Sequence, residues 1–274
     1  MKLARYRYYL FAVLFGILYS FSFLESGTGR YEMFDMINRL GFSEFLIEPS
    51  YLQNFFIWYF HFFVFQMMYG TYIYKHFCTA CVYYFCRMNN RIRWFLKETL
   101  KLFANSLIYV ILLFLMYIGF GSIFGSMIVT KEAIIFLGYY IILHSTWLFI
   151  TALLVNICSI WWDSSKGFTI VYSVQLVFII LYAALQSYLR FDIGDIEQKS
   201  KILKLNPISH LVLKWHSSQI QSINSKINIF RITFDLNESV CVYAIMSVLV
   251  FGIGCFVVKK QDFISNNRET GGAE

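Results

Sequence analysis

Long stretches of this sequence contain no charged residue, and charge is scarce throughout. Of its 274 residues 14% are charged and 58% are hydrophobic, against about 25% and about 45–50% in an ordinary soluble domain. Two prolines and six cysteines argue against a proline-rich disordered chain and against a disulfide-stapled scaffold. A water-soluble fold of this length could not bury so much apolar surface, so we expect the excess to face lipid.

Six apolar runs without Lys, Arg, Asp or Glu predict helices that cross a bilayer. A helix needs about 20 apolar residues to cross a hydrocarbon core of about 30 Å. The runs are residues 8–24, 54–74, 102–123, 133–156, 168–189 and 240–258. No repeat or linker divides the chain, so the sequence predicts an all-α integral membrane protein with six transmembrane helices in a single domain, residues 1–274.

The placement of basic residues predicts the orientation. Lys2, Arg5 and Arg7 precede the first run without an acid, and residues 75–101 carry six basic residues against Glu98 alone. Cytoplasmic loops carry such an excess of Lys and Arg, so both termini and residues 75–101 are expected inside. Residues 190–239 are then external although basic residues outnumber acids there, since the bias fades in long loops.

Other interpretations of the basic residues are less favoured. The net charge of +7 could indicate a nucleic-acid partner, but the charges lie in short blocks between apolar runs, as membrane topology requires. The first run could be a secretory signal peptide, but the segment after it, residues 25–28, lacks a small-x-small cleavage site. We therefore expect an uncleaved first span and no nucleic acid.

Two segments outside the runs have helical patterns. From Arg91, apolar residues share one face while Arg93, Lys97 and Lys101 recur every four residues, which predicts either a helix at the headgroup boundary or only topology-setting charge. In the external segment, Asn206 and Pro207 predict a helix start. Ile208, Leu211, Val212 and Trp215 then fall at helical spacing, so a short amphipathic helix is expected on the outer leaflet, with Ser209, Lys214 and Ser217 on its polar face.

Several chemistries have no support in the sequence. The runs contain no carboxylate, lysine or arginine, only His61, His144 and neutral polar side chains, which argues against proton or sodium coupling. No phosphate-binding loop and no zinc motif is present, and Gly119-Phe120-Gly121-Ser122 matches a serine-nucleophile motif only loosely. The chain is therefore not expected to be an enzyme, to bind a metal or to hydrolyse ATP by itself.

The whole pattern resembles the ABC-2 type permease subunits of ATP-driven transporters, and within them the small permeases of bacterial peptide and lantibiotic immunity or export systems. Two stretches carry the resemblance: residues 83–97, which look like a coupling region leading into the third span, and residues 205–211, which are similar to an Asn-Pro segment ahead of the last span. The resemblance implies a type V exporter-like fold in the bacterial cell membrane. It also implies a permease dimer, identical or mixed, with two cytoplasmic ATPase subunits that bind ATP and Mg.

The resemblance also implies roles for particular residues. A coupling helix from about residue 75 to residue 90 would contact the ATPase, and spans two and five would line the path of an amphipathic peptide or lipid-like cargo, which the 20% aromatic content suits. The coupling residues are Tyr83, Tyr84, Arg87, Asn89, Asn90, Arg91 and Arg93; the path residues are Trp58, His61, Gln66, Tyr69, Tyr172, Gln175 and Gln186; the external helix has Asn206, Pro207, His210 and Trp215. Two alternatives stay open: a membrane protein that acts by binding, such as an immunity factor or sensor, and an intramembrane enzyme.

Overall fold

The structure, a computed structural model, describes residues 2–21, 30–41, 49–83, 90–191, 196–228 and 234–261. These residues are almost entirely helical. The order is α1 (Lys2–Ser20), β1 (Arg30–Glu32), α2 (Met33–Leu40), α3 (Pro49–Tyr69), α4 (Tyr72–Tyr83), α5 (Arg91–Gly121), β2 (Ser126–Ile128), α6 (Lys131–Trp161), α7 (Ser164–Phe191), α8 (Ile196–Leu205), the 3-10 helices η2 (Pro207–Leu211) and η3 (Leu213–Trp215), α9 (Gln221–Ile227) and α10 (Leu236–Lys260).

Within the described residues, four helices are long and apolar enough to cross a membrane: α5, α6, α10 and residues 164–184 of α7. They confirm four of the predicted spans as apolar helices and indicate a membrane protein. Residues 9–20 of α1 form a shorter apolar helix. The second predicted span is interrupted, because α3 ends at Tyr69 and α4 begins at Tyr72.

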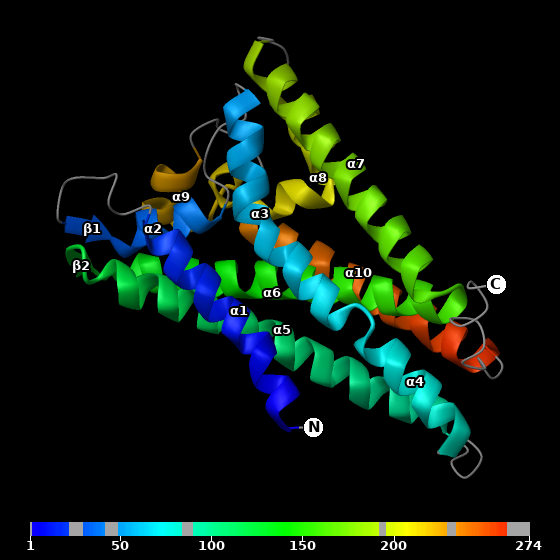
Figure 1. The fold of residues 1–274 in the computed structure, drawn as a ribbon. Helices are drawn as coiled ribbons and strands as arrows, with labels where there is room; N and C mark the ends of the chain where they lie inside the picture. Colours follow the sequence, from blue (N-terminus) through cyan, green and yellow to red (C-terminus); the bar gives the residue numbers. More distant parts are fainter. Residues whose placement is uncertain are drawn as a thin grey trace.

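Helix α6 is the centre of the fold. It contacts α5, α7, α10, α2, α3 and α4, and 78% of its most apolar 18-residue stretch is buried, against 22% for α10 and 28% for α7. Figure 1 shows α1 and α3 lying across the long helices, with α4 beside the start of α5. The outer faces of α7 and α10 leave large apolar side chains exposed, Ile180 and Val248 among them, as lipid-facing helices do.

Contacts between helices fix their directions. Tyr9 of α1 donates a hydrogen bond to Asn105 Oδ1 in the middle of α5, and a Cβ on Gly16 would meet Leu113 and Met116 about two to three turns further along α5. The two helices therefore run in the same direction. Helix α10 runs opposite to α5, since Arg91 Nη1 donates to the carbonyl of Gln261 at 3.1 Å.

The two ends of the molecule are different. At one end, here called the sheet end, β1 pairs in parallel with β2, with Tyr31 opposite Met127; α6 and α10 begin there, capped by the side chains of Thr130 and Asp235. At the other, the α4 end, α4 lies near the start of α5, which the side chain of Asn90 caps. Side-chain acceptors at the N-cap satisfy backbone donors that the helix itself leaves unpaired.

Candidate functional site

The two path glutamines face each other in the interior. Gln66 Nε2 donates to Gln175 Oε1 at 2.9 Å, and Gln175 Nε2 donates back to Gln66 Oε1 at 2.8 Å. Gln66 Nε2 also reaches Thr151 Oγ1 at 3.0 Å, while Tyr59 donates to Gln175 and accepts from Trp147 Nε1. This network joins α3, α6 and α7. The amides satisfy each other and link the three helices.

His61 and Trp58 lie on the side of α3 that faces α1. His61 is buried, and its Nδ1 lies 2.7 Å from the carbonyl of Trp58 and 3.2 Å from the hydroxyl of Tyr19. The half-buried indole of Trp58 packs on the Tyr19 ring with centroids 4.4 Å apart. Both residues therefore hold α1 against α3.

The remaining path residues are spread along α3 and α7. Tyr69 is buried and stacks on Phe65 with centroids 4.6 Å apart, whereas the half-buried Tyr172 donates to the carbonyl of Phe63. Gln186 belongs to α7, but its side chain lies outside the described part. The six predicted path residues whose side chains are described thus make contacts between and along helices.

Asn156 of α6 bridges the break between α3 and α4. Its Oδ1 accepts from the backbone N–H groups of Ile73 (2.7 Å) and Tyr74 (3.1 Å), and its Nδ2 donates to the carbonyl of Tyr69 (2.8 Å). Backbone groups freed by a break at membrane depth need such partners. Gly70 fits the break because a Cβ there would lie 2.8 Å from Val155 Cγ1.

A second link joins α4 to α5. Glu98 is 5% exposed; its Oε1 accepts from Lys101 Nζ at 2.6 Å, and its Oε2 lies at ion-pair distance, 3.4 Å, from His76 Nδ1 of α4. The expected interfacial helix from Arg91 is instead the first part of α5, continuous with the third predicted span.

The structure describes only part of the predicted coupling region. Asn90 accepts from the backbone N–H of Arg93 as the N-cap of α5, and the Arg93 side chain is exposed. Tyr83 ends α4, but its side chain is outside the described part, as are the whole of Tyr84, Arg87 and Asn89.

The α4 end carries a hollow between the α3–α4 break and the turn that joins α6 to α7. Its volume is about 980 Å³, and it is lined by Met67, Thr71, Lys75, Trp161, Trp162, Asp163, Ser164, Ser165, Lys166 and Phe168. Asp163 caps α7, and its hydrogen bonds from the backbone N–H and side chain of Lys166 hold the pKa of its carboxyl below the ordinary value. Lys75 of α4 lines this hollow.

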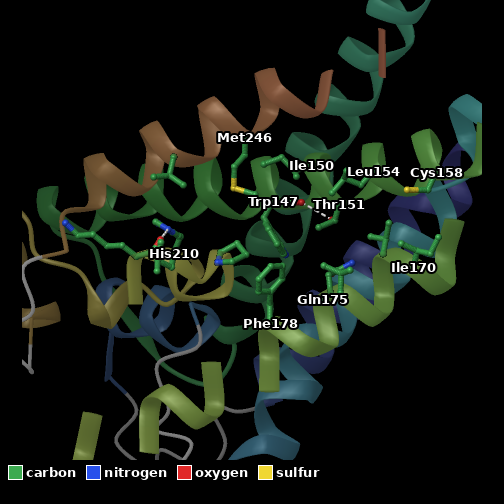
Figure 2. Close-up of a pocket in the computed structure, with 16 residues that line it drawn as sticks. Trp147, Ile150, Thr151, Leu154, Cys158, Ile170, Gln175, Phe178, His210 and Met246 are labelled. Atoms are coloured by element: carbon green, nitrogen blue, oxygen red, sulfur yellow. Dashed lines mark hydrogen bonds between the residues drawn. The ribbon is translucent and has the colours of Figure 1, made fainter. Parts of the chain in front are cut away.

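A largely apolar cavity of about 410 Å³, here called the lateral groove, lies between α6, α7 and α10. Figure 2 shows Trp147, Thr151 and Cys158 of α6, Gln175 and Phe178 of α7 and Met246 of α10 around it. The other lining residues are Ile150, Leu154, Ile170, Val171, Val174, Lys204, Leu205, Pro207, His210 and Val242. Thr151 and Gln175 are polar lining residues along its length, and Lys204, its one formally charged lining residue, lies with His210 towards the sheet end.

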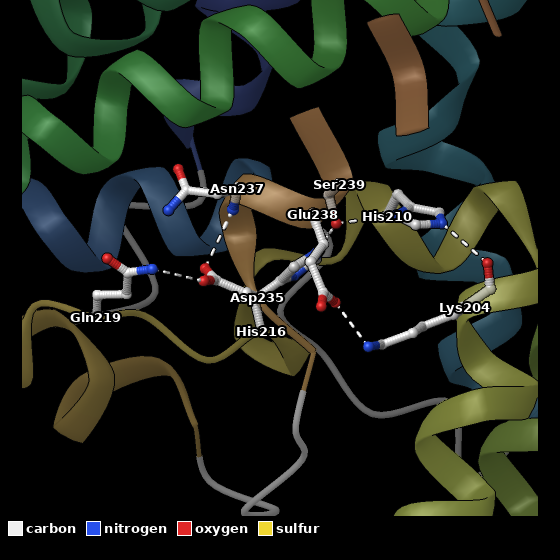
Figure 3. Close-up of polar contacts among 8 residues, drawn as sticks. All are labelled: Lys204, His210, His216, Gln219, Asp235, Asn237, Glu238 and Ser239. Atoms are coloured by element: carbon white, nitrogen blue, oxygen red, sulfur yellow. Dashed lines mark hydrogen bonds and ion pairs between the residues drawn. The ribbon is translucent and has the colours of Figure 1, made fainter. Parts of the chain in front are cut away.

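Lys204 and His210 also line a neighbouring cavity, here called the polar end, with Gln219, Phe234, Asp235, Asn237, Glu238, Cys241 and Val242. Lys204 Nζ pairs with Glu238 Oε2 at 2.6 Å. Asp235 accepts from the backbone N–H of Asn237 at 3.1 Å as the N-cap of α10. Figure 3 shows these contacts gathered where α10 begins.

Two histidines meet one serine beneath the polar end. Ser239 Oγ lies 2.9 Å from His210 Nδ1 and 2.7 Å from His216 Nε2, and His216 Nδ1 lies 2.9 Å from the carbonyl of Val212. All three side chains are buried. Burial lowers the pKa of His210 to about 4 and that of His216 to about 3, so both are neutral at pH 7. The cluster ties the segment before α10 to the first turn of that helix.

The external amphipathic helix is only partly as predicted. Asn206 does accept from the backbone N–H of Ile208, and Pro207 is the first residue of the helix that follows. The chain forms the two short 3-10 helices η2 and η3, however, instead of one α-helix. Ser209, expected on a polar face, is buried, as is Trp215. The segment packs beneath α7 and α10, with Asn206 Nδ2 donating to the carbonyl of Phe178 and Tyr243 donating to that of Pro207. Burial, rather than amphipathicity, determines its conformation.

No protein-family model, curated protein or solved structure matches the chain.

Proposed function

We propose that the chain is the permease subunit of an ATP-driven transporter of the ABC-2 type, paired with a second permease copy or a paralogue and with two cytoplasmic ATPase subunits. One observation carries the proposal: α4 is held to the central helix α6 through Asn156 and contacts α5 through His76 and Glu98. A movement imposed on α4 would therefore pass directly into the packed core, as a coupling helix requires.

The helix directions support six crossings. Trp147, Thr151 and Asn156 of α6 contact Tyr59, Gln66 and Tyr69 of α3 in the same order, so α3 runs with α6 and opposite to α1 and α5. With α7 opposite to α6 and α10 opposite to α5, consecutive long helices alternate in direction. An alternating order is the one that six successive spans need.

The charges support a cytoplasmic α4 end. Lys75 of α4, Arg91 and Arg93 at the start of α5 and Lys259 and Lys260 at the end of α10 all belong to this end. Positive residues concentrate on the cytoplasmic side. The hollow at this end, with exposed Trp161 and Trp162, offers a surface for a partner subunit.

The interior supports a path between permease copies rather than through one copy. The Gln66–Gln175 pair closes the space between α3, α6 and α7 with mutual hydrogen bonds. An amphipathic peptide or lipid-like cargo would then move along the outside of the bundle, where apolar faces are exposed.

A change at one exposed arginine tests the coupling. In proteoliposomes that contain the copurified complex, Arg93→Glu should leave basal ATP hydrolysis intact and abolish its dependence on cargo, because the repelled partner loses its contact with α5. Lys131→Glu is the matched control, an exposed basic residue in the first turn of α6 at the sheet end, and should behave as the wild type. If ATP hydrolysis depended on cargo equally in both variants, the assignment of the α4 end as the ATPase contact would be contradicted.

A binding role, such as that of an immunity factor or sensor, is favoured by the closed Gln66–Gln175 network, which leaves no polar route within the described helices of one copy. The same preparation separates the two functions, since a binding protein would purify without an ATPase and would retain its ligand in the absence of ATP.

A further inference from the structure

The lateral groove and the polar end adjoin each other, one largely apolar and the other charged. Both are lined by Lys204, His210 and Val242. On α6 the apolar part reaches from Trp147 to Cys158, which at 1.5 Å per residue is roughly 16 Å, about half of a hydrocarbon core of about 30 Å. Since α6 begins at the sheet end, this stretch lies in the half of the helix nearer the α4 end, and the groove is long enough for one acyl chain that runs inward from the polar end.

The charges at the polar end are mixed. Lys204 supplies one positive charge and Asp235 and Glu238 supply two negative charges, while His210 is neutral because burial lowers its pKa. An anionic headgroup would meet more negative than positive charge. A zwitterionic headgroup could place its phosphate at Lys204 and its cation at the carboxylates, so that every charge keeps an opposite partner.

Hydrogen bonding distinguishes between zwitterionic headgroups. Glu238 is 52% exposed at its side chain, and carboxylate oxygens can accept more than one hydrogen bond each. A primary ammonium brings three N–H donors, whereas a quaternary ammonium brings none. Charge-assisted hydrogen bonds are about twice as strong as neutral ones, so the site favours the primary ammonium.

We propose that the lateral groove and the polar end together bind one phospholipid with a zwitterionic, primary-amine headgroup. Its acyl chain lies between α6, α7 and α10, its phosphate faces Lys204, and its ammonium faces Glu238 and Asp235. This binding needs no ATPase and goes beyond the proposed transport function.

Competition between three defined lipids tests the site. The purified chain in detergent is mixed with equal amounts of phosphatidylethanolamine, phosphatidylcholine and phosphatidylglycerol of identical acyl chains, and retained lipid is counted by native mass spectrometry. We expect one phosphatidylethanolamine per chain, favoured about tenfold over the other two, the factor that one charge-assisted hydrogen bond supplies. Glu238→Gln and Lys204→Met should each abolish this preference.

The chain provides matched controls. Lys226 and Glu32 form another Lys–Glu pair at the sheet end, at 2.7 Å, and Lys226→Met or Glu32→Gln should leave lipid retention unchanged. Met246→Trp should fill the apolar groove and reduce retention, whereas Leu249→Trp, on the exposed side of α10 and outside the lining, should not. Thermal unfolding of each variant shows that a loss of lipid is not a loss of fold.

Three results would overturn the proposal. Equal retention of all three lipids would indicate ordinary surrounding lipid, and unchanged retention in a folded Met246→Trp variant would place the lipid elsewhere. A lipid-free dimer that Met246→Trp dissociates would show that a second copy fills the groove. None of these results bears on ATP coupling, so the proposed transport function is tested separately.

Discussion

Replacing Asn156, the one side-chain amide of α6, by alanine should destabilise the fold more than removing the Asn105 amide of α5. The substitution leaves three backbone groups at the α3–α4 break without their partner: the N–H groups of Ile73 and Tyr74 and the carbonyl of Tyr69. The two N–H groups belong to the first turn of α4, where a helix offers no acceptor of its own.

The size of the effect follows from this count. Hydrogen bonds between membrane helices contribute about 0.6 kcal/mol each on average, which for three bonds gives a lower estimate of about 2 kcal/mol. A buried polar group left unsatisfied costs about 1–3 kcal/mol, which gives about 6 kcal/mol for three groups at the middle of that range. The larger figure should apply if water does not reach the three backbone groups. Thr71, which lies between them at the edge of the hollow, is only 8% exposed, so the break is largely closed to water.

Equilibrium unfolding in mixed micelles, followed by far-ultraviolet circular dichroism, measures the loss. Asn105→Ala is the matched control, since the Asn105 side chain accepts one hydrogen bond, from Tyr9 at 2.8 Å in a partly buried position, and its removal should cost about 0.6 kcal/mol. Equal free energies of unfolding for the two variants would refute the idea that Asn156 holds α4 to α6.

Three further perturbations test the α3–α4 break, the glutamine pair and the histidine cluster. Gly70→Ala should lower the midpoint of thermal unfolding, because its Cβ would lie 2.8 Å from a methyl carbon of α6 and overpacking costs about 1–3 kcal/mol. Gln175→Leu and Gln66→Leu should each destabilise the fold, and the double variant should lose less free energy of unfolding than the sum of the two single variants, since each single change already removes both hydrogen bonds between the amides; additive free energies would contradict the paired geometry. For His210 and His216, burial lowers the pKa to about 4 and about 3, below the unfolded value of about 6.5. The neutral forms therefore stabilise the fold fully above pH about 6.5, and this contribution is lost as the pH falls towards 4. Replacing both histidines by glutamine should flatten the pH dependence of the free energy of unfolding between pH 7 and 5. An unchanged pH dependence would contradict the burial of these two histidines as neutral groups.

Uncharged runs predicted the long helices well, because a helix that must satisfy its backbone in lipid leaves a long apolar signature. Residues 133–156, 168–189 and 240–258 lie within α6, α7 and α10, and residues 102–123 lie in α5 except for the last two, which follow its end at Gly121. The end of α3 at Tyr69 was missed. Gly70 was visible, but the partner that makes a break there tolerable, Asn156, is more than 80 residues away in the sequence.

The site residues were less predictable, because polar side chains in apolar runs do not show what they face. Gln66 and Gln175 were chosen as path residues, and only the packing of α3 against α7 reveals that they satisfy each other across 109 positions of sequence. Likewise Asn206 and Pro207 correctly predicted a helix start, but no local pattern showed that Ser209 would be buried beneath α7 and α10. In the sequence, Lys204 and Glu238 are two charges of the segment 190–239, and only the fold brings them together beside the groove.

Affinity purification of the chain from its native membrane, in a mild detergent, tests the central claim most directly. We expect an ATPase subunit to copurify in a ratio of about one per permease, with ATP hydrolysis that depends on the permease. A chain that purifies alone, folded and without associated ATP hydrolysis, would contradict the permease assignment.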